Sequence, residues 1–143
     1  MPMAEYRGTV RVAADPSEVL PYVADLTNLT EWDSSVRAVV PSEASGLVPA
    51  RRYDVVVGFF GRELKASYEI VDDSPDAVAW RIDGKVSGTA RVAVTARAGG
   101  SDIDYRLAIS LKGLARLLDR GLNVALEGIG ANAEQGLQRQ FGC

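Results

Sequence analysis

Histidine is absent from this sequence of 143 residues, and the only cysteine is Cys143, the last residue. Histidine is the commonest general base in enzymes and the commonest neutral metal ligand. Its absence excludes serine–histidine and cysteine–histidine catalytic pairs, and it deprives zinc of one of its preferred ligands. A single cysteine forms no intrachain disulfide, which fits a reducing compartment such as the cytoplasm. These residue types indicate no metal site and identify no catalytic residue.

Strong charge of one sign and long apolar runs are also missing. The 16 basic and 19 acidic residues give a net charge of −3 and are scattered along the chain. A nucleic-acid-binding protein needs a basic face, so nucleic acid is not an expected partner. No apolar run approaches the ~18 residues of a membrane span, and the opening residues lack the features of a signal peptide. We expect residues 1–143 to form one cytoplasmic domain.

Alternating apolar and polar residues dominate the middle of the chain and predict a sheet with one solvated face. The clearest alternation is in residues 62–71. Similar patterns predict strands at residues 5–13, 35–40, 51–59, 77–83, 86–97 and 101–112. In the strand at 35–40, Val36, Ala38 and Val40 are expected on one face. The total is six or seven antiparallel strands.

Two helical patterns flank these strands. Asp15 and Pro16 are typical of a helix start, and Pro21 predicts that the helix is short or bent. A much longer amphipathic pattern covers residues 114–140. The predicted inward face of this long helix comprises Leu114, Leu118, Leu122, Ala125, Ile129, Asn132 and Gly136. We expect the long helix to cover the apolar face of the sheet.

Glycines weaken this long helix. Gly121, Gly128, Gly130 and Gly136 each cost roughly 1 kcal/mol relative to alanine in a helix interior. Two explanations stay open. Small residues let a helix pack closely on a sheet and leave a solid core, or they leave room for a ligand between the two.

Polar atoms on the expected inward faces favour a ligand cavity, because an apolar pocket with a few polar groups is the usual form of a small-molecule site. The residues expected to contact a ligand are Tyr53, Tyr68, Trp80, Tyr105, Ala125 and Asn132. The alternative is that these groups satisfy one another, or bind water, within a filled core. The strand patterns place no carboxylate or lysine on the inward face.

Two adjacent phenylalanines lie in a segment that is expected to be exposed. Phe59 and Phe60 lie between Gly58 and Gly61 at a predicted hairpin tip. Two exposed phenylalanines are unusual on a monomer, so they predict the portal of the cavity or a partner contact. The alternative is that the tip folds back onto the long helix.

The first third of the chain resembles the opening of the START-like, or SRPBCC, superfamily, especially its polyketide cyclase/dehydratase-like branch. The shared pattern is a strand, then A-x-P-x-x-V, an aspartate, and a tryptophan followed by aspartate. The matching residues here are Ala14, Pro16, Val19, Asp25, Trp32 and Asp33. The resemblance implies an α+β helix-grip fold. In this fold a curved antiparallel sheet wraps around the C-terminal helix, and two short helices follow the first strand.

The resemblance also implies a role for Trp32, which stands in the polar stretch LTNLTEWDSS. In this fold a second short helix closes one end of the space between the sheet and the long helix. Trp32 is therefore expected to plug that end as a structural residue. Asp25 and Asp33 are expected to be local caps or turn acceptors.

Three functions are consistent with these observations. The first is binding of a hydrophobic or aromatic small molecule, lipid-like or polyketide-like, between the sheet and the long helix. The second is a cofactor-free polyketide aromatase/cyclase-type enzyme that uses tyrosine hydroxyls or Asn132 as hydrogen-bond donors. The third is a protein–protein interaction module with a filled core. No cofactor is expected, and the chain is expected to be a monomer or a weak homodimer.

Overall fold

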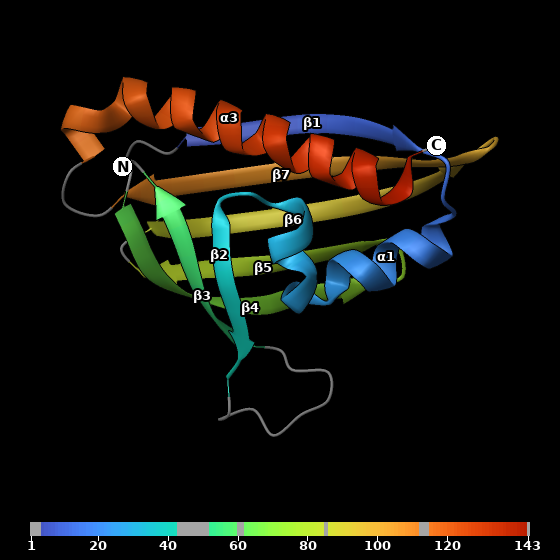
Figure 1. The fold of residues 1–143 in the computed structure, drawn as a ribbon, viewed down its shortest axis with the longest axis horizontal. Coiled ribbons are helices and arrows are strands. Elements are labelled where there is room, and N and C mark those ends of the chain that lie inside the picture. The colour runs from blue at the N-terminus through green and yellow to red at the C-terminus, as the bar shows by residue number, and fades with distance from the viewer. Residues whose placement is uncertain (1–3, 43–51, 60–61, 85, 112–114, 143) are drawn as a thin grey trace.

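The computed structural model describes residues 4–42, 52–59, 62–84, 86–111 and 115–142. Seven antiparallel strands form one sheet in the order β1-β7-β6-β5-β4-β3-β2, which confirms the expected α+β helix-grip fold (Figure 1). The strands are β1 (Ala4–Val12), β2 (Val36–Pro41), β3 (Arg52–Phe59), β4 (Arg62–Ser74), β5 (Ala77–Gly84), β6 (Val86–Arg97) and β7 (Gly100–Leu111).

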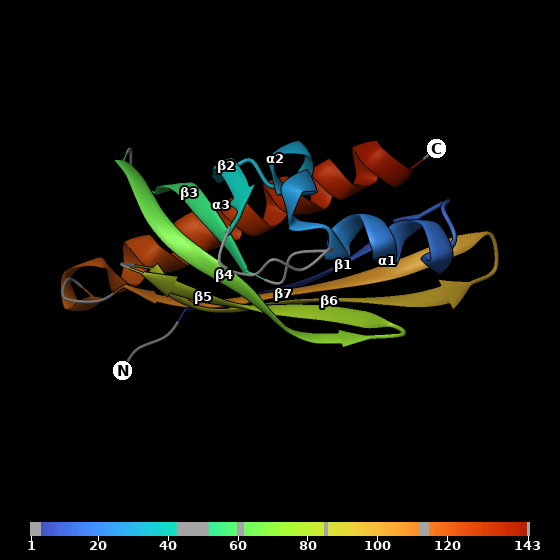
Figure 2. The ribbon, with the colours of Figure 1, turned by 90° about the horizontal axis from the view of Figure 1, so that it is seen from below.

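The helices all lie on one face of the sheet (Figure 2). They are α1 (Pro16–Ala24), the 3₁₀ turn η1 (Leu26–Asn28), α2 (Leu29–Trp32) and α3 (Ala115–Phe141). The helix α3 runs along β1 and β7, whereas α1 and α2 stand beside it over the middle of the sheet. Within the described residues, no helix is long and apolar enough to cross a membrane.

The inward faces of β3, β4, β5 and β7 follow the predicted alternation, because every second side chain of a strand points to the same face. The buried side chains on these strands are Tyr53, Val55, Val57, Ala66, Tyr68, Ile70, Val78, Trp80, Ile82, Ile103, Tyr105, Leu107 and Ile109. The core therefore lies between this face of the sheet and the helices.

The predicted face of β2 is wrong beyond its first residue. Val36 is buried, but Ala38 is exposed and Val40 is 59% exposed. The register of β2 against β3 shifts between Val36 and Ala38, which marks a β-bulge. An inserted residue reverses the side on which all later side chains of a strand point.

The described part of α3 is rotated relative to the predicted inward face. Gly130, Ala133, Gly136 and Leu137 are buried, whereas Asn132 is exposed. The inward position of Asn132 was therefore a wrong prediction. The inward positions advance by four residues, from the partly buried Ile129 to the buried Ala133 and Leu137. The prediction advanced by three residues from Ile129 and so placed Asn132 on this face.

Two glycines of α3 allow close packing. A Cβ on Gly130 would lie 2.3 Å from the ring of Tyr6 in β1, and a Cβ on Gly136 would lie 2.2 Å from the backbone oxygen of Trp32. Both distances are too short for a side chain, so these two residues favour the close-packing explanation. Gly128 is exposed and has nothing near it, so it contributes nothing to this packing.

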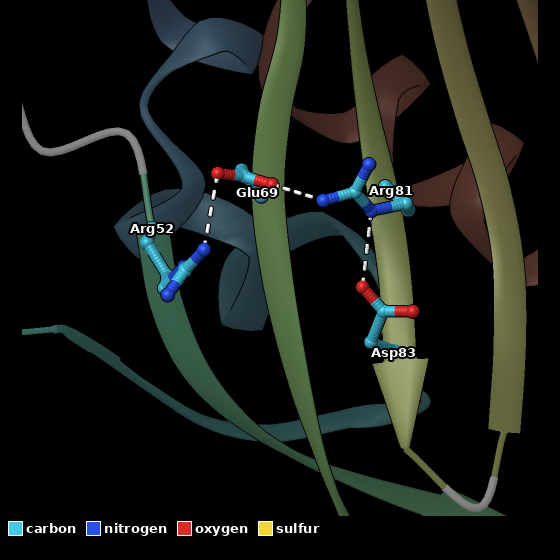
Figure 3. A network of polar contacts seen from close by, with 4 residues as sticks. All are labelled: Arg52, Glu69, Arg81 and Asp83. Carbon is cyan, nitrogen blue, oxygen red and sulfur yellow. Dashed lines mark hydrogen bonds and ion pairs between the residues drawn. The ribbon is translucent and has the colours of Figure 1, made fainter.

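The opposite face of the sheet carries charged side chains that pair across strands (Figure 3). Glu69 of β4 accepts from Arg52 of β3 at 3.2 Å and also pairs with Arg81 of β5. Arg81 in turn contacts Asp83 at 3.0 Å. Exposed pairs of this kind contribute about 0–1 kcal/mol each, so they keep this face solvated more than they stabilise the fold.

Replacing Gly136 and Gly128 with alanine should change stability in opposite directions. Gly136→Ala should lower the free energy of unfolding by roughly 1–3 kcal/mol, because the new methyl group meets the Trp32 backbone. Gly128→Ala should raise it by up to about 1 kcal/mol, because alanine is the better helix former and meets nothing. Urea unfolding measures both. Equal effects would contradict the close approach of α3 to α2.

Candidate functional site

A small cavity lies between the inner face of the sheet and α3. Its volume is about 30 Å³, which is room for about one or two water molecules. The apolar part of its lining comes from β3, β5, β6 and β7, with Ile129 contributed by α3. The lining residues that carry a polar side-chain atom are Asp33, Ser35, Tyr68, Trp80 and Tyr105.

Three of the predicted ligand contacts border this cavity. Tyr68, Trp80 and Tyr105 come from β4, β5 and β7, and all are buried, with exposed fractions of 6%, 2% and 1%. The indole Nε1 of Trp80 has no hydrogen-bond partner in the part of the chain that the structure describes. The three residues therefore bring aromatic surface and polar atoms to one place.

The remaining predicted contacts lie elsewhere. Tyr53 is buried but is not among the lining residues, and it forms a hydrogen bond with the backbone of Leu26 in η1. Asn132 is exposed, as described above. The side chains of Ala125 and Phe59, and the whole of Phe60, lie outside the described residues, so the predicted portal stays a prediction.

Asp33 is the acidic residue of the cavity, and it sits at the junction between α2 and β2. Its N–H donates to the carbonyl of Leu29 at 2.8 Å, and its own carbonyl accepts from the N–H of Val36 at 3.0 Å. Its side-chain Oδ1 accepts from both the N–H and the hydroxyl of Ser35, at 3.0 and 2.6 Å. These bonds fix the carboxyl group while it borders the cavity.

The strand patterns missed Asp33 because it precedes β2. Alternation assigns faces only within a strand, whereas the direction of Asp33 is set by the turn that ends α2. The expected role as a turn acceptor is confirmed by the two bonds from Ser35. Its position on the cavity has one weak signal in the sequence, which is its place directly after Trp32, the residue predicted to plug this end of the core.

Burial sets the electrostatics of the site. It raises the pKa of Asp33 above the ordinary value of 3.8, and the two hydrogen bonds from Ser35 offset this effect only in part. The pKa values of Tyr68 and Tyr105 are also raised, first by burial and then by the negative charge of Asp33. The tyrosines therefore keep their protons and act as hydrogen-bond donors or neutral acceptors.

Packed aromatic rings lie at the end of the core next to Asp33. The rings of Trp32 and Tyr105 meet edge to face with centroids 5.8 Å apart, and Tyr6 lies on Tyr105 at 6.2 Å. Trp32 is 1% exposed and is not among the lining residues. It therefore closes the end of the core as a structural residue and fixes the ring of Tyr105.

This arrangement offers one carboxyl group and two phenol hydroxyls to a molecule in the cavity. A buried carboxyl group whose pKa is raised can exchange a proton with a bound molecule, and phenol hydroxyls can polarise a carbonyl oxygen. Within the described residues, no group of three acidic or cysteine side chains lies close enough together to hold a metal ion.

Comparison with known proteins gives a family and a fold. A family model described as "Polyketide cyclase / dehydrase and lipid transport" matches residues 3–140. Comparison with curated proteins gave no match.

Among solved structures, the aromatase/cyclase ZhuI from Streptomyces sp. R1128 is similar with a TM-score of 0.77 and 13% identity, covering 97% of this chain and 93% of that one. A START superfamily protein from Mycobacterium smegmatis is similar with a TM-score of 0.71 and 12% identity, covering 95% and 98%. At these identities the likeness concerns the fold.

Asp33→Asn should remove a pH dependence from the stability of the protein. Because the pKa of Asp33 is raised, the folded state holds this proton more tightly than the unfolded chain does. The resulting stabilisation is complete below the ordinary pKa of 3.8 and is lost as the pH rises through the folded value. The free energy of unfolding of the wild type, relative to Asp33→Asn, should therefore fall with rising pH, by at most about 1.4 kcal/mol per pH unit.

Urea unfolding of both proteins at a series of pH values measures this difference, in which the contributions of other groups cancel. A difference that does not change with pH would contradict the burial of the Asp33 carboxyl group.

Proposed function

Because this chain belongs to the polyketide cyclase / dehydrase and lipid transport family, we propose that it binds a hydrophobic or aromatic small molecule in the cavity beneath α3. The observation that carries this proposal is the composition of the cavity lining. Aliphatic side chains make up most of it, and the polar residues Asp33, Ser35, Tyr68 and Tyr105 stand on the same lining. This combination is typical of small-molecule sites.

The cavity is too small for such a ligand unless part of its lining moves. Sites for drug-sized molecules measure about 300–1,000 Å³, whereas this cavity measures about 30 Å³. A ligand must therefore displace part of the lining. The second half of α3 is held at several points, by Gly130 on Tyr6, by Gly136 on the Trp32 backbone and by a hydrogen bond from Tyr6 to Glu134. Ile129, which is only partly buried, is the described side chain of α3 on the cavity wall and is the one we expect to move.

A second candidate function, an aromatase/cyclase-type enzyme, is favoured by Asp33. The strand patterns placed no carboxylate inside, which counted against catalysis. The carboxyl group of Asp33 on the cavity lining removes that objection, because a buried acid of raised pKa is suited to general acid–base work. The tyrosine hydroxyls would then polarise a substrate carbonyl while the cavity folds the chain of the substrate.

The ligand-binding proposal predicts an adduct and a difference between two tyrosines. Native mass spectrometry of freshly purified protein should show a bound organic molecule that leaves on denaturation. In calorimetric titrations with 1-naphthol, Tyr68→Phe should weaken binding about fivefold through loss of one hydrogen bond. Tyr53→Phe is the matched control, since Tyr53 is also buried but does not line the cavity, and it should leave the affinity unchanged. A clean mass together with no binding of naphthol would favour the filled-core module instead.

The enzyme candidate makes a separate prediction. If the protein cyclises a poly-β-keto thioester mimic, Asp33→Asn should slow turnover about 10²-fold or more, as expected when a general acid or base is lost. Asp25→Asn, which removes an exposed carboxylate that caps η1, should leave the rate unchanged. Product formation followed by liquid chromatography measures both. Equal rates for the two variants would contradict a catalytic role of Asp33.

A further inference from the structure

We infer that Asp33 makes the cavity select ligands that bury a neutral hydroxyl group at this end and makes it reject ligands that carry a carboxylate there. The inference rests on the proposed function, because it names the class of molecule that the proposed site accepts.

The first step is the charge of the site. Asp33 is the acid on the lining, and the described lining residues include no lysine or arginine. None of the ion pairs among the described residues involves Asp33. An anionic ligand group would therefore be buried beside another acid, with no described cation to offset its charge. Burying an unpaired carboxylate is costly where water is excluded, whichever protonation state Asp33 has.

The second step is the hydrogen bonding that is left over. Both bonds that the Asp33 carboxyl group accepts within the described residues fall on Oδ1, from Ser35. Within the described residues Oδ2 accepts no hydrogen bond, so it is the oxygen of this lining residue that is available to accept a bond from a ligand. The hydroxyls of Tyr68 and Tyr105 are on the same lining and can donate. A ligand hydroxyl both donates and accepts, so it can satisfy Asp33 and one tyrosine at once.

The third step explains why the site favours a ligand hydroxyl group over a ligand ammonium group, although Asp33 can interact with both. Removing an ammonium group from water carries a desolvation penalty that can exceed its attraction to a single carboxylate. A hydroxyl group loses much less on burial and regains it through two hydrogen bonds. The other polar groups on the lining are the neutral hydroxyls of Ser35, Tyr68 and Tyr105, and the lining residues include no second carboxylate to offset the charge of an ammonium group.

The experiment compares four naphthalene probes by titration calorimetry at neutral pH. They are naphthalene, 1-naphthol, 1-naphthoate and 1-naphthylmethylammonium, which share one ring system and differ in the charge of one group. Wild-type protein should bind 1-naphthol most tightly, with 1-naphthoate weaker by about tenfold or more. Asp33→Asn keeps an oxygen that can accept from Ser35 and replaces the acid with an amide that can donate to a ligand carboxylate, so it should bring the two affinities to within about twofold of each other.

Asp25→Asn is the matched control. Asp25 is an exposed carboxylate eight positions earlier that accepts from Thr27 and does not line the cavity, so this variant should keep the wild-type ranking. If Asp33→Asn does not fold, the ranking of the four probes on the wild type still decides the matter.

Each other outcome overturns the inference. Equal or tighter binding of naphthoate, or tightest binding of the ammonium probe, means that Asp33 does not select a neutral hydroxyl. Binding of naphthalene and naphthol with an unchanged ranking in Asp33→Asn keeps the ligand site and removes the role of Asp33. Failure of all four probes to bind counts against the proposed function and against this inference with it.

Discussion

The close approach of α3 to the backbone of Trp32 is the constraint on which the rest of the structure depends. Gly136 meets the Trp32 carbonyl at a distance that leaves no room for a side chain. The same short segment does two further things. The ring of Trp32 packs against Tyr105, and Asp33, the next residue, turns its carboxyl group to the cavity. The position of α3, the end wall of the core and the polar end of the site are therefore set together, by one contact between two backbones.

The fold was largely predictable from the sequence, because the strands of this sheet have one solvated face. Alternation in β3, β4, β5 and β7 depends only on the pleat of a strand, and most of the residues expected on the inward faces of these strands are buried, although Leu64 is only partly buried. The errors arose where a neighbour decides the outcome. The bulge in β2 is a feature of its pairing with β3, and the rotation that exposes Asn132 follows from the contacts that Gly130 and Gly136 make with Tyr6 and Trp32. A pattern within one segment carries no information about such partners.

In the candidate site too, the positions of residues on regular strands were predictable, whereas the position of a residue between two elements was not. Tyr68, Trp80 and Tyr105 were found because they stand on regular strands. Asp33 was assigned only to a turn, since a side chain between two elements has no period to indicate its direction. It is nevertheless the acidic residue on the lining, and under the proposed function its carboxyl group would limit which ligand groups can enter. A fold shared by an aromatase/cyclase and a START superfamily protein does not choose between functions, so that choice depends on individual residues of this kind.

The two tryptophans of the chain, Trp32 and Trp80, occupy different positions relative to the cavity, and this difference bears on the fluorescence of the protein. Both indoles are buried, at 1% and 2% exposure, so neither is quenched by bulk solvent in the folded state. Trp80 borders the cavity, whereas Trp32 stands behind the ring of Tyr105 and outside the lining. Under the proposed function, a ligand in the cavity would contact the indole of Trp80 and would reach that of Trp32 only through the ring of Tyr105. Of the two indoles, that of Trp80 is therefore the one whose emission should respond directly to a bound molecule.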